Sequence, residues 1–375
     1  MNLLLKIGAF IAIFWACLGC AQSHSDDTFS FDDRAYTPQY ASGFVVDADS
    51  NGNTILRVTR PWQGDNPQEQ NLAIFTDREA AKGYTGEHMI GYARRIVCMS
   101  TSHIAMLESL GKSEYVVGVS GKEYIMNPKI ANSSDVYDVG YDSNIDFERL
   151  ISLKPDVVLM YGITAENSII TAKLHELNIP YLYLGDYTEQ SPLGKAEWIV
   201  AIAEIIGCRE RGIALFNDVV SRYEQLRANV DTTLKPKVMF NLPYQDVWYM
   251  PADDSYMVRL IEDAGGTYIY KGKNVSGGSK GISLEEALLL VRDADIWLNV
   301  GQCNTIDEVR SAAPHFCDSE VVRRGNVYNN NRRRTAAGGS DFWESAIVHP
   351  DVVLRDLIAI MNGESDSLYY HHKLQ

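Results

Sequence analysis

Residues 192–231 read PLGKAEWIVAIAEIIGCRERGIALFNDVVSRYEQLRANVD, and this stretch decides how the rest of the chain is organised. Apolar residues recur in it at helical spacing. They are Trp198, Ile199, Ile202, Ile205, Ile206, Ile213, Phe216, Val219, Val220, Tyr223 and Leu226. A helix of this length would span roughly 50 to 60 Å, more than one ordinary lobe needs. We therefore predict a single long helix over residues 191–232 that joins two bodies. Because glycine is a weak helix former, Gly207 and Gly212 leave the alternative of two helices in a hairpin.

Length and composition limit the classes to which this protein can belong. The chain has 375 residues, 46% of them hydrophobic, which is enough for two domains with a core each. Its formal net charge is −15. Because phosphate binding needs a surplus of lysine and arginine, nucleic acid is excluded as a partner. A basic protein surface is still a compatible partner for an acidic chain.

The N-terminus has the pattern of an export signal. A weakly basic start precedes an apolar run over residues 7–18, which is too short for a permanent transmembrane helix. The exit Leu18-Gly19-Cys20 resembles a bacterial lipobox, although Cys17 stands at the usual leucine position. We predict that residues 1–20 are a lipoprotein signal peptide and that Cys20 is the lipidation site. The alternative is a plain cleaved signal peptide.

This prediction places the protein in the cell envelope, anchored by lipid to a membrane and facing the periplasm. Ser25-Asp26-Asp27 resembles the acidic tag that sends some lipoproteins to the cell surface, which is the alternative location. A solvated tether is the simpler meaning of three such residues.

Four cysteines remain after Cys20, and their spacing argues against a metal site. Cys303 and Cys317 are the only pair close in sequence, and an exported protein permits a disulfide between them. Cys98 and Cys208 are expected to be small buried hydrophobes. The sequence has no Cys-x-x-Cys and no dense group of histidines and carboxylates, so we expect no bare metal ion and no resident cofactor.

Residues 21–93 are hydrophilic at first and then β-like. Two apolar segments, 44–46 and 55–58, flank Asn51-Gly52, which is a strong signal for a β-hairpin. We predict a tether followed by an N-terminal β-hairpin extension.

From residue 94 onward strands and helices alternate, which is typical of a mostly parallel sheet covered by helices. In a first lobe, 94–190, we expect strands 95–99, 115–120, 136–140, 156–161 and 181–185 and helices 102–110, 146–153 and 166–177. In a second lobe, 233–363, we expect strands 237–242, 295–300 and 326–330 and helices 255–264, 283–291, 305–312 and 349–361. Residues 364–375 are expected to form a C-terminal tail. The fold class is therefore α/β.

The two lobes share a pattern. The segment 146–162 opens with Asp146, has Glu148 in the first helical turn, and ends in a strand that stops at glycine. The segment 283–301 repeats this order with Ser283 and Glu285. In both segments an N-cap residue and an early acidic residue fit a helix start. The chain is thus expected to contain two related lobes.

Several segments together resemble the helical-backbone substrate-binding proteins of ABC importers, a group that carries ferric siderophores, haem and cobalamin. In chain order they are 95–103 (RIVCMSTSH), 107–111 with 117–119, 138–140 (DVG), 147–159 (FERLISLKPDVVL), 260–266 (LIEDAGG) and 349–357 (HPDVVLRDL). The resemblance covers residues 95–361 and leaves 21–93 outside. It implies two Rossmann-like α/β lobes joined by one long rigid helix, with the ligand cleft between the lobes and little closure on binding.

The resemblance also implies a docking role for two carboxylates. In this family, glutamates in the first turn of matching helices in the two lobes dock to arginines of the membrane permease. The matching residues here are Glu148 and Glu285, with Glu286 as a possible substitute for Glu285. The implied partners are an ABC permease and its ATPase, and we expect a monomer. The alternative is that each glutamate only complements a helix N-terminus, worth roughly 0.3 to 1 kcal/mol.

Ligand contacts are expected in the loops after the strands, where the cleft of an α/β protein opens. The aromatic candidates in these loops are Tyr124, Tyr141, Trp248, Tyr249, Phe342 and Trp343, with Tyr161 and Tyr244 nearby. Flat rings can cover a corrin, a porphyrin or a catecholate. The alternative for each ring is that it completes the core of a lobe. His103 is expected to cap a helix or line the cleft.

Arg332, Arg333 and Arg334 form the one dense basic run of the chain and are further ligand-binding candidates. Guanidinium groups bind carboxylates in bidentate fashion, so the run suits an acidic ferric chelate or haem. A solvated charged loop is the alternative. The following stretch, Ser340 to Glu344, resembles the corresponding segment of cobalamin-binding members. The two features point to different ligands.

We therefore expect a substrate-binding lipoprotein that captures an iron chelate, haem or a corrinoid and delivers it to an importer, and we expect no enzymatic activity. The alternatives are an enzyme on the same two-lobed scaffold or a surface-exposed receptor partner. Against an enzyme, the sequence has no Gly-x-Ser-x-Gly, no phosphate-binding Gly-x-x-x-x-Gly-Lys and no His-Glu-x-x-His.

Overall fold

The computed structural model describes residues 29–63, 68–163, 165–273 and 278–375, and the elements below belong to one unit of residues 31–375. The predicted signal peptide and the predicted lipidation site at Cys20 lie outside the described residues. Among the helices in these ranges, none combines the length and the hydrophobicity that a bilayer span requires.

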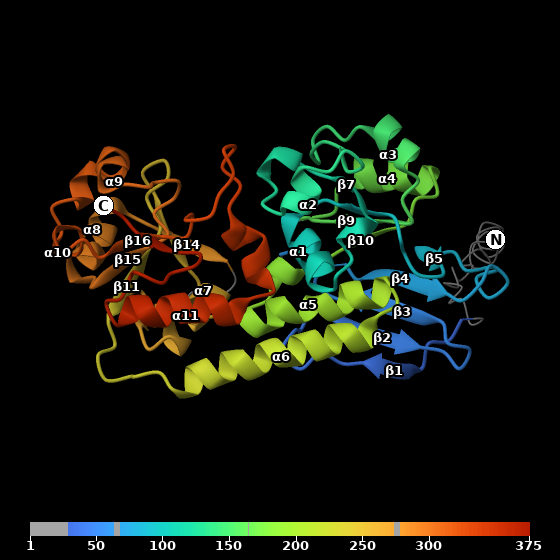
Figure 1. The fold of residues 1–375 in the computed structure, drawn as a ribbon, viewed down its shortest axis with the longest axis horizontal. Coiled ribbons are helices and arrows are strands. Elements are labelled where there is room, and N and C mark those ends of the chain that lie inside the picture. Colours follow the sequence, from blue (N-terminus) through green and yellow to red (C-terminus); the bar gives the residue numbers. More distant parts are fainter. Residues whose placement is uncertain (1–28, 64–67, 164, 274–277) are drawn as a thin grey trace, which may run out of the picture. The chain divides into compact units, whose positions relative to one another are not determined.

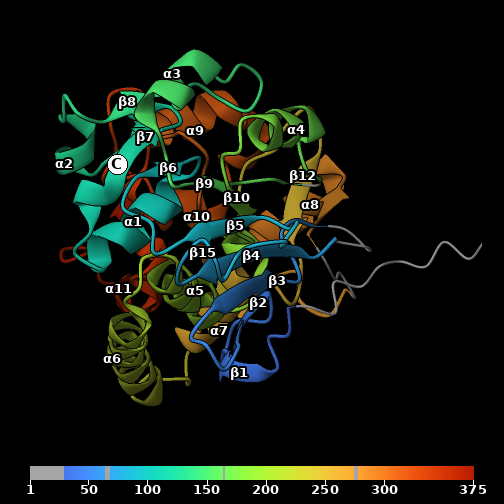
Figure 2. The same ribbon diagram turned by 90° about the vertical axis from the view of Figure 1, so that its right-hand side faces the viewer.

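The N-terminal extension is a five-stranded sheet in the order β1-β2-β3-β4-β5 (Figure 2). Its strands are β1 (Asp33–Tyr36), β2 (Phe44–Ala48), β3 (Thr54–Val58), β4 (Gln70–Phe75) and β5 (His88–Ile90). The predicted hairpin is present as the antiparallel pair β2–β3. In its turn, the Asp49 carboxylate accepts hydrogen bonds from the N–H groups of Asn51 and Asn53 at 2.8 and 2.9 Å. The extension is larger than predicted, because three further strands join this hairpin.

The first lobe is built on a parallel sheet in the order β10-β9-β6-β7-β8 (Figure 2). Its strands are β6 (Ile96–Cys98), β7 (Val116–Val119), β8 (Tyr137–Asp138), β9 (Val157–Met160) and β10 (Tyr181–Tyr183). Its helices are α1 (Thr101–Ser109), α2 (Pro128–Ala131), α3 (Phe147–Leu153) and α4 (Ser168–Glu176). Strands β6, β7 and β9 are buried along their whole length, as expected for a sheet covered on both faces. Only the short α2 was absent from the prediction.

The second lobe has a sheet in the order β13-β11-β15-β16-β17. Its strands are β11 (Lys237–Phe240), β13 (Thr267–Tyr268), β15 (Ile296–Leu298), β16 (Val327–Asn329) and β17 (His372–Lys373). Its helices are α7 (Tyr256–Asp263), α8 (Leu284–Asp293), α9 (Ile306–Ala312), α10 (Glu320–Arg323) and α11 (Pro350–Met361). A separate antiparallel ribbon, which the sequence did not predict, joins β12 (Trp248–Pro251) to β14 (Ser279–Ile282).

The C-terminal residues belong to the second lobe and do not form the predicted tail. Strand β17 pairs antiparallel with β16. The buried carboxylate of Asp356 accepts hydrogen bonds from the N–H groups of Tyr369, Tyr370 and His371 at 2.7 to 3.1 Å. These charge-assisted bonds fix the last residues to α11.

The sheet orders establish the internal repeat. The order β10-β9-β6-β7 in the first lobe corresponds to β16-β15-β11-β13 in the second, so the two sheets have the same topology. In each lobe the helix before the second strand of this order begins at a side-chain cap: Asp146 accepts from Arg149 N–H, and Ser283 accepts from Glu286 N–H. Helices α3 and α8 are therefore equivalent, as the sequence pattern predicted.

The predicted long helix is wrong, and the alternative of two helices in a hairpin is correct. The segment forms α5 (Pro192–Ile205) and α6 (Arg209–Ala228), which pack against each other (Figure 1). At the break, the N–H of Cys208 donates to the Ala203 carbonyl and the N–H of Gly207 to the Glu204 carbonyl. This is a Schellman turn, which needs a left-handed residue after the helix, and Gly207 supplies it with a φ of 72°.

The helices of this hairpin approach closely because Gly212 lies at their contact. A Cβ at position 212 would be 2.6 Å from the Cβ of Ala203. The α5–α6 hairpin therefore replaces the strut, and α6 carries the chain onward to the second lobe (Figure 1).

Replacing Gly207 by Ala should destabilise the protein by about 2 to 4 kcal/mol. A left-handed φ costs an L-residue about 1 to 2 kcal/mol, and the new Cβ would collide with the ring of Tyr92, for which overpacking adds a similar amount. Urea unfolding measures the change. Gly363→Ala is the matched control, because Gly363 has a φ of 79° with nothing within 4 Å. Equal costs for the two variants would contradict the Tyr92 contact.

Candidate functional site

A cavity of about 500 Å³ lies where the strands of the first lobe end and face the second lobe, and we call it the cleft cavity. Its wall in the first lobe and α5 consists of Ser100, Thr101, Ser102, Tyr161, Asp186, Tyr187, Pro192 and Lys195. Its wall in the second lobe consists of Tyr256, Leu260, Phe342, Trp343, Ala346, Ile347, Pro350 and Val353. The carboxyl ends of parallel strands are where α/β proteins bind ligands, and this volume is ordinary for a small-molecule site.

The first-lobe wall presents two tyrosines from neighbouring strands. Tyr161 follows β9 and Tyr187 follows β10, and their rings are 5.0 Å apart at 61°. The hydroxyl of Tyr187 donates to the Ile163 carbonyl at 2.7 Å, which fixes the ring. Burial raises the pKa of both phenols, so they stay protonated at neutral pH. The wall is thus aromatic with hydroxyl donors at its edge.

The N-terminal extension supports this wall. The N–H of Gln63 donates to the Ile163 carbonyl at 3.0 Å and lies 3.2 Å from the Tyr187 hydroxyl. The ring of Trp62 packs edge-on against Tyr183 at 5.5 Å. The extension thereby holds the loop from which Tyr187 reaches the cavity.

The second-lobe wall is the turn η5 (Asp341–Trp343) and the turn η6 (Ser345–Ile347) that follows it. Phe342 is buried and packs against Trp343 with ring centroids 5.0 Å apart. Trp343 is 58% exposed, and its carbonyl accepts a hydrogen bond from the Thr101 hydroxyl at 3.3 Å. An exposed indole fixed at the cavity wall is available to cover a flat ligand.

The charged groups of the cavity are Lys195 and Asp186. The ammonium of Lys195 donates to the backbone carbonyl of Asp186 at 3.2 Å and lies 4.6 Å from the ring centre of Tyr256. Burial lowers the pKa of Lys195 and raises that of Asp186. His103 lies beneath them, with its Nε2 3.9 Å from Asp186 Oδ1. Burial lowers the pKa of His103 to about 3, so it is neutral, and it neither caps α1 nor lines the cavity.

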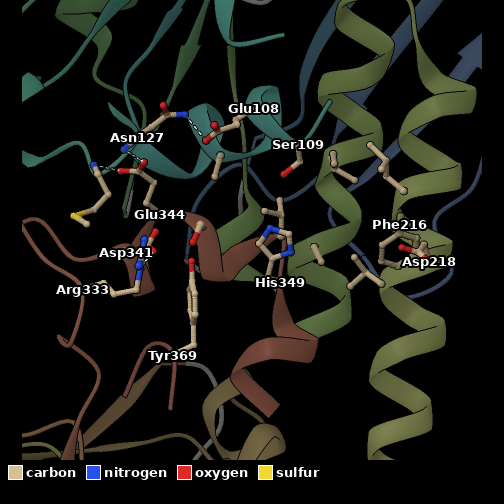
Figure 3. A pocket seen from close by; sticks show the side chains of 18 of the residues that line it. Glu108, Ser109, Asn127, Phe216, Asp218, Arg333, Asp341, Glu344, His349 and Tyr369 are labelled. Carbon is tan, nitrogen blue, oxygen red and sulfur yellow. Dashed lines mark hydrogen bonds and ion pairs between the residues drawn. The ribbon is translucent and has the colours of Figure 1, made fainter. Parts of the chain in front are cut away.

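The two lobes are joined beside this cavity by Glu344. Its carboxylate accepts hydrogen bonds from the N–H groups of Met126 and Asn127, at 2.7 and 2.8 Å, just before α2 (Figure 3). Nearby, Gly339 lies against the backbone of Tyr124, where a Cβ would collide with the carbonyl. Burial raises the pKa of Glu344 to about 7.

A second cavity, of about 470 Å³, lies on the other side of Glu344 and is lined by the α5–α6 hairpin; we call it the hairpin cavity (Figure 3). Its charged groups are largely paired with each other. Arg333 Nε lies 2.6 Å from Asp341 Oδ2, and Glu108 accepts from the Asn127 amide. Because the strand ends open into the cleft cavity and not here, the cleft cavity is the candidate site.

The sequence candidates divide between the cavity and other places. Phe342 and Trp343 lie in the wall of the cleft cavity. Tyr124 and Tyr141 are exposed beside Gly121, and Tyr249 is exposed on β12, all outside the cavity wall. The prediction for Trp248 is wrong. Its ring is fully buried between Trp297 and Phe316, and its Nε1 donates to the Phe240 carbonyl at 2.7 Å, so it is a core residue.

The arginine run, Arg332–Arg334, does not line the cleft cavity. Arg332 donates to the Leu368 carbonyl, and Arg333 pairs with Asp341 and lies 4.6 Å from the ring centre of Tyr369. The prediction that these arginines bind the ligand directly is therefore not supported by their positions.

Sequence reasoning missed four charged or aromatic residues of the cavity, Asp186, Tyr187, Lys195 and Tyr256, and also its aliphatic residues. A signal was available for Lys195, which is the one basic residue of a mostly apolar helix and lies near its start. The tyrosines carried no such signal, because nothing in their sequence context separates them from core tyrosines.

The described residues contain neither a disulfide nor a cluster of metal-binding side chains. All four cysteines among the described residues are free, including Cys303 and Cys317, so the disulfide allowed by their spacing is not formed. Within the described ranges, no group of three or more histidine, cysteine or acidic side chains is arranged to hold a metal ion.

The two docking candidates occupy equivalent places. Glu148 lies exposed in the first turn of α3 and Glu285 in the first turn of α8, and neither has an ion-pair partner among the described residues. Hydrogen bonds at the helix start lower the pKa of Glu285, so it is charged at neutral pH. Glu286 is exposed beside it.

Comparisons with known proteins match this architecture. Residues 96–332 match the family model described as periplasmic binding protein. An uncharacterized lipoprotein of Methanocaldococcus jannaschii is 27% identical over 283 residues, which cover 72% of this chain but just under two thirds, 66%, of that relative. A periplasmic heme binding protein from Pseudomonas aeruginosa superposes with a TM-score of 0.58 at 15% identity, over 76% of this chain and 98% of that one. The periplasmic vitamin B12 binding protein of Vibrio cholerae superposes with a TM-score of 0.52 at 16% identity, over 72% of this chain and 97% of that one. At these identities the solved structures share the fold alone.

Raising the pH should weaken the wild-type protein relative to Glu344→Gln. The pKa of Glu344 rises from 4.5 to about 7 on folding, so its stabilising contribution is complete below pH 4.5 and is lost as the pH rises through 7. The difference in unfolding free energy between the two proteins should change by about 2 to 3 kcal/mol between pH 5 and pH 8. Urea unfolding at both pH values measures it, and a constant difference would contradict the burial of this carboxyl group.

Proposed function

Because the chain belongs to the family of periplasmic binding proteins, we propose that it captures a metal chelate or corrinoid in the cleft cavity and delivers it to an ABC importer. The observation that carries the proposal is the aromatic cavity between the lobes, with Tyr161 and Tyr187 on one side and Trp343 on the other. Such rings suit a large flat or globular ligand with an apolar surface.

Three further features support capture over catalysis. The cavity has a volume of about 500 Å³, and the lobes are bridged beside it by Glu344. The buried His103 has no access to the cavity, so it is a poor general base. Solved proteins with this fold include a heme binding protein and a vitamin B12 binding protein, which makes iron chelates, haem and corrinoids the classes to test.

The proposed route of delivery uses the outer faces of both lobes. Glu148 and Glu285 lie exposed on the equivalent helices α3 and α8, and a pair of charges related by the repeat fits a permease with two related halves. Anchoring at a lipidated Cys20 would hold the protein near that permease in the cell envelope. A relative described as a lipoprotein supports this part of the proposal.

The ligand class can be identified by titrating residues 21–375 with cobinamide, cobalamin, haem, ferric citrate and ferric hydroxamate and catecholate chelates. Binding should quench the fluorescence of Trp343 and raise the melting temperature. A ligand at 100 times its dissociation constant stabilises the native state by about 2.7 kcal/mol. Trp343→Phe should remove most of the quenching but keep binding. The absence of binding by every chelate would refute the proposed function.

Replacing Glu148 and Glu285 together by alanine should abolish uptake of the chelate identified above and leave its affinity unchanged. The control is Glu210→Ala, because Glu210 is an exposed glutamate in the first turn of α6. All three changes remove a helix-start charge worth roughly 0.3 to 1 kcal/mol, so stability should fall by a similar small amount per residue. Uptake by cells and affinity in solution are measured in parallel. Normal uptake by the double variant would refute the docking role.

A further inference from the structure

The charge around the cleft cavity is balanced. Among the described residues that line it, Lys195 is the only lysine or arginine and Asp186 is the only acid. The remaining lining residues are aromatic, aliphatic or hydroxyl-bearing. None of the three arginines of the run lines this cavity: Arg332 donates to the Leu368 carbonyl and Arg333 pairs with Asp341. The cavity therefore contains one cation, Lys195, and the single acid, Asp186, offsets its charge.

Lys195 is placed to meet a ligand. Every residue of α5 except Lys195 is buried, and Lys195 is the only charged residue of this helix that lines the cleft cavity. An ammonium group has three hydrogens, and the one hydrogen bond that the structure gives the Lys195 ammonium goes to the Asp186 carbonyl. The face of Tyr256, 4.6 Å away, holds the ammonium in position. At least one donor is thus available to an oxygen atom of the ligand.

We propose that the cleft cavity is selective for a chelate without net negative charge, one oxygen of which accepts a hydrogen bond from Lys195. This inference rests on the proposed function, since it names the charge class of the chelate that the same cavity captures. A neutral hydroxamate chelate or a corrinoid with carboxamide groups meets the requirement, whereas a ferric tris-catecholate, with three negative charges, does not.

The physical reason is the cost of an unbalanced charge. A multiply charged anion would lose hydration on entering the cavity and would find one ammonium that already balances Asp186. Sites that bind such anions present several guanidinium groups for bidentate contacts. The chain as a whole carries a net charge of −15, so long-range repulsion adds to the penalty.

The test compares two ferric chelates of similar size, a neutral tris-hydroxamate and a tris-catecholate, on the unmodified protein. We expect the neutral chelate to bind at least a hundredfold more tightly in low salt. Added salt screens repulsion, so the affinity of the catecholate should rise with ionic strength, whereas the affinity of the neutral chelate should stay constant. This comparison needs no variant and is not affected by folding defects.

A second arm tests the residue itself. Lys195→Met keeps the stem and removes the donors, and it should weaken the neutral chelate or cobinamide about tenfold or more. Lys195→Arg, which keeps a charged donor, should bind more tightly than Lys195→Met. Lys280→Met is the control for the same chemical change, because Lys280 is exposed on β14 outside the cavity, and it should change nothing.

The outcomes separate the two proposals. If the catecholate binds as tightly as the neutral chelates, or if Lys195→Met leaves a bound chelate unaffected, the charge selectivity is wrong and the capture function stands. If neither iron chelate, nor haem, nor a corrinoid binds at any salt concentration, the capture function itself is refuted and the charge selectivity falls with it.

Discussion

Helix α5 is surrounded by protein on all sides, and the rest of the fold depends on how its polar groups are satisfied. Thirteen of its fourteen residues are buried, among them the carboxylates of Glu197 and Glu204. Glu197 accepts hydrogen bonds from the Tyr36 hydroxyl and from the N–H groups of Gln39, Tyr40 and Ala41, all at 2.7 to 2.8 Å. Glu204 accepts from the Thr54 hydroxyl and from Arg209. A buried charge without such partners costs several kcal/mol, so the N-terminal extension is required for α5 to occupy this position.

This dependence makes the extension part of the unit that forms the cleft cavity, although the family match begins only at residue 96. Residues 60–63 follow β3 within the extension, and Arg60 and Gln63 contact the loop that carries Asp186 and Tyr187. The same loop ends at Glu189, whose carboxylate accepts from the N–H groups of Ser42 and Gly43. One set of buried carboxylates therefore fixes both the central helix and one wall of the cleft cavity.

Features that local sequence patterns determine could be predicted from the sequence. Features that depend on tertiary packing could not. The β2–β3 hairpin, the alternating strands and helices and the repeat around Glu148 and Glu285 follow from turn chemistry, caps and periodicity. The single long helix was predicted wrongly because α5 is mostly apolar and α6 has one apolar face. Their apolar residues continue one another at helical spacing, so the turn at Gly207 does not interrupt the pattern. Trp248 and Trp343 both lie in segments that the sequence analysis assigned to loops, and only the tertiary structure shows that Trp248 is a core residue and that Trp343 is an exposed residue of the cavity wall. Lys195 differs from these tryptophans, because its place as the one basic residue of a mostly apolar helix was visible in the sequence.

The arginine run shows why a charged cluster near a site need not touch the ligand. Arg333 neutralises Asp341, which is 4% exposed and begins the turn that carries Phe342 and Trp343 to the cleft cavity. Glu344, the next residue, binds the first lobe. Removing the guanidinium would leave a buried carboxylate unpaired at the base of this turn, and the wall would move although no ligand contact had been lost. Loss of ligand binding on mutation of Arg333 would therefore report on the position of Trp343, whereas the same loss at Lys195 would report on the ligand itself.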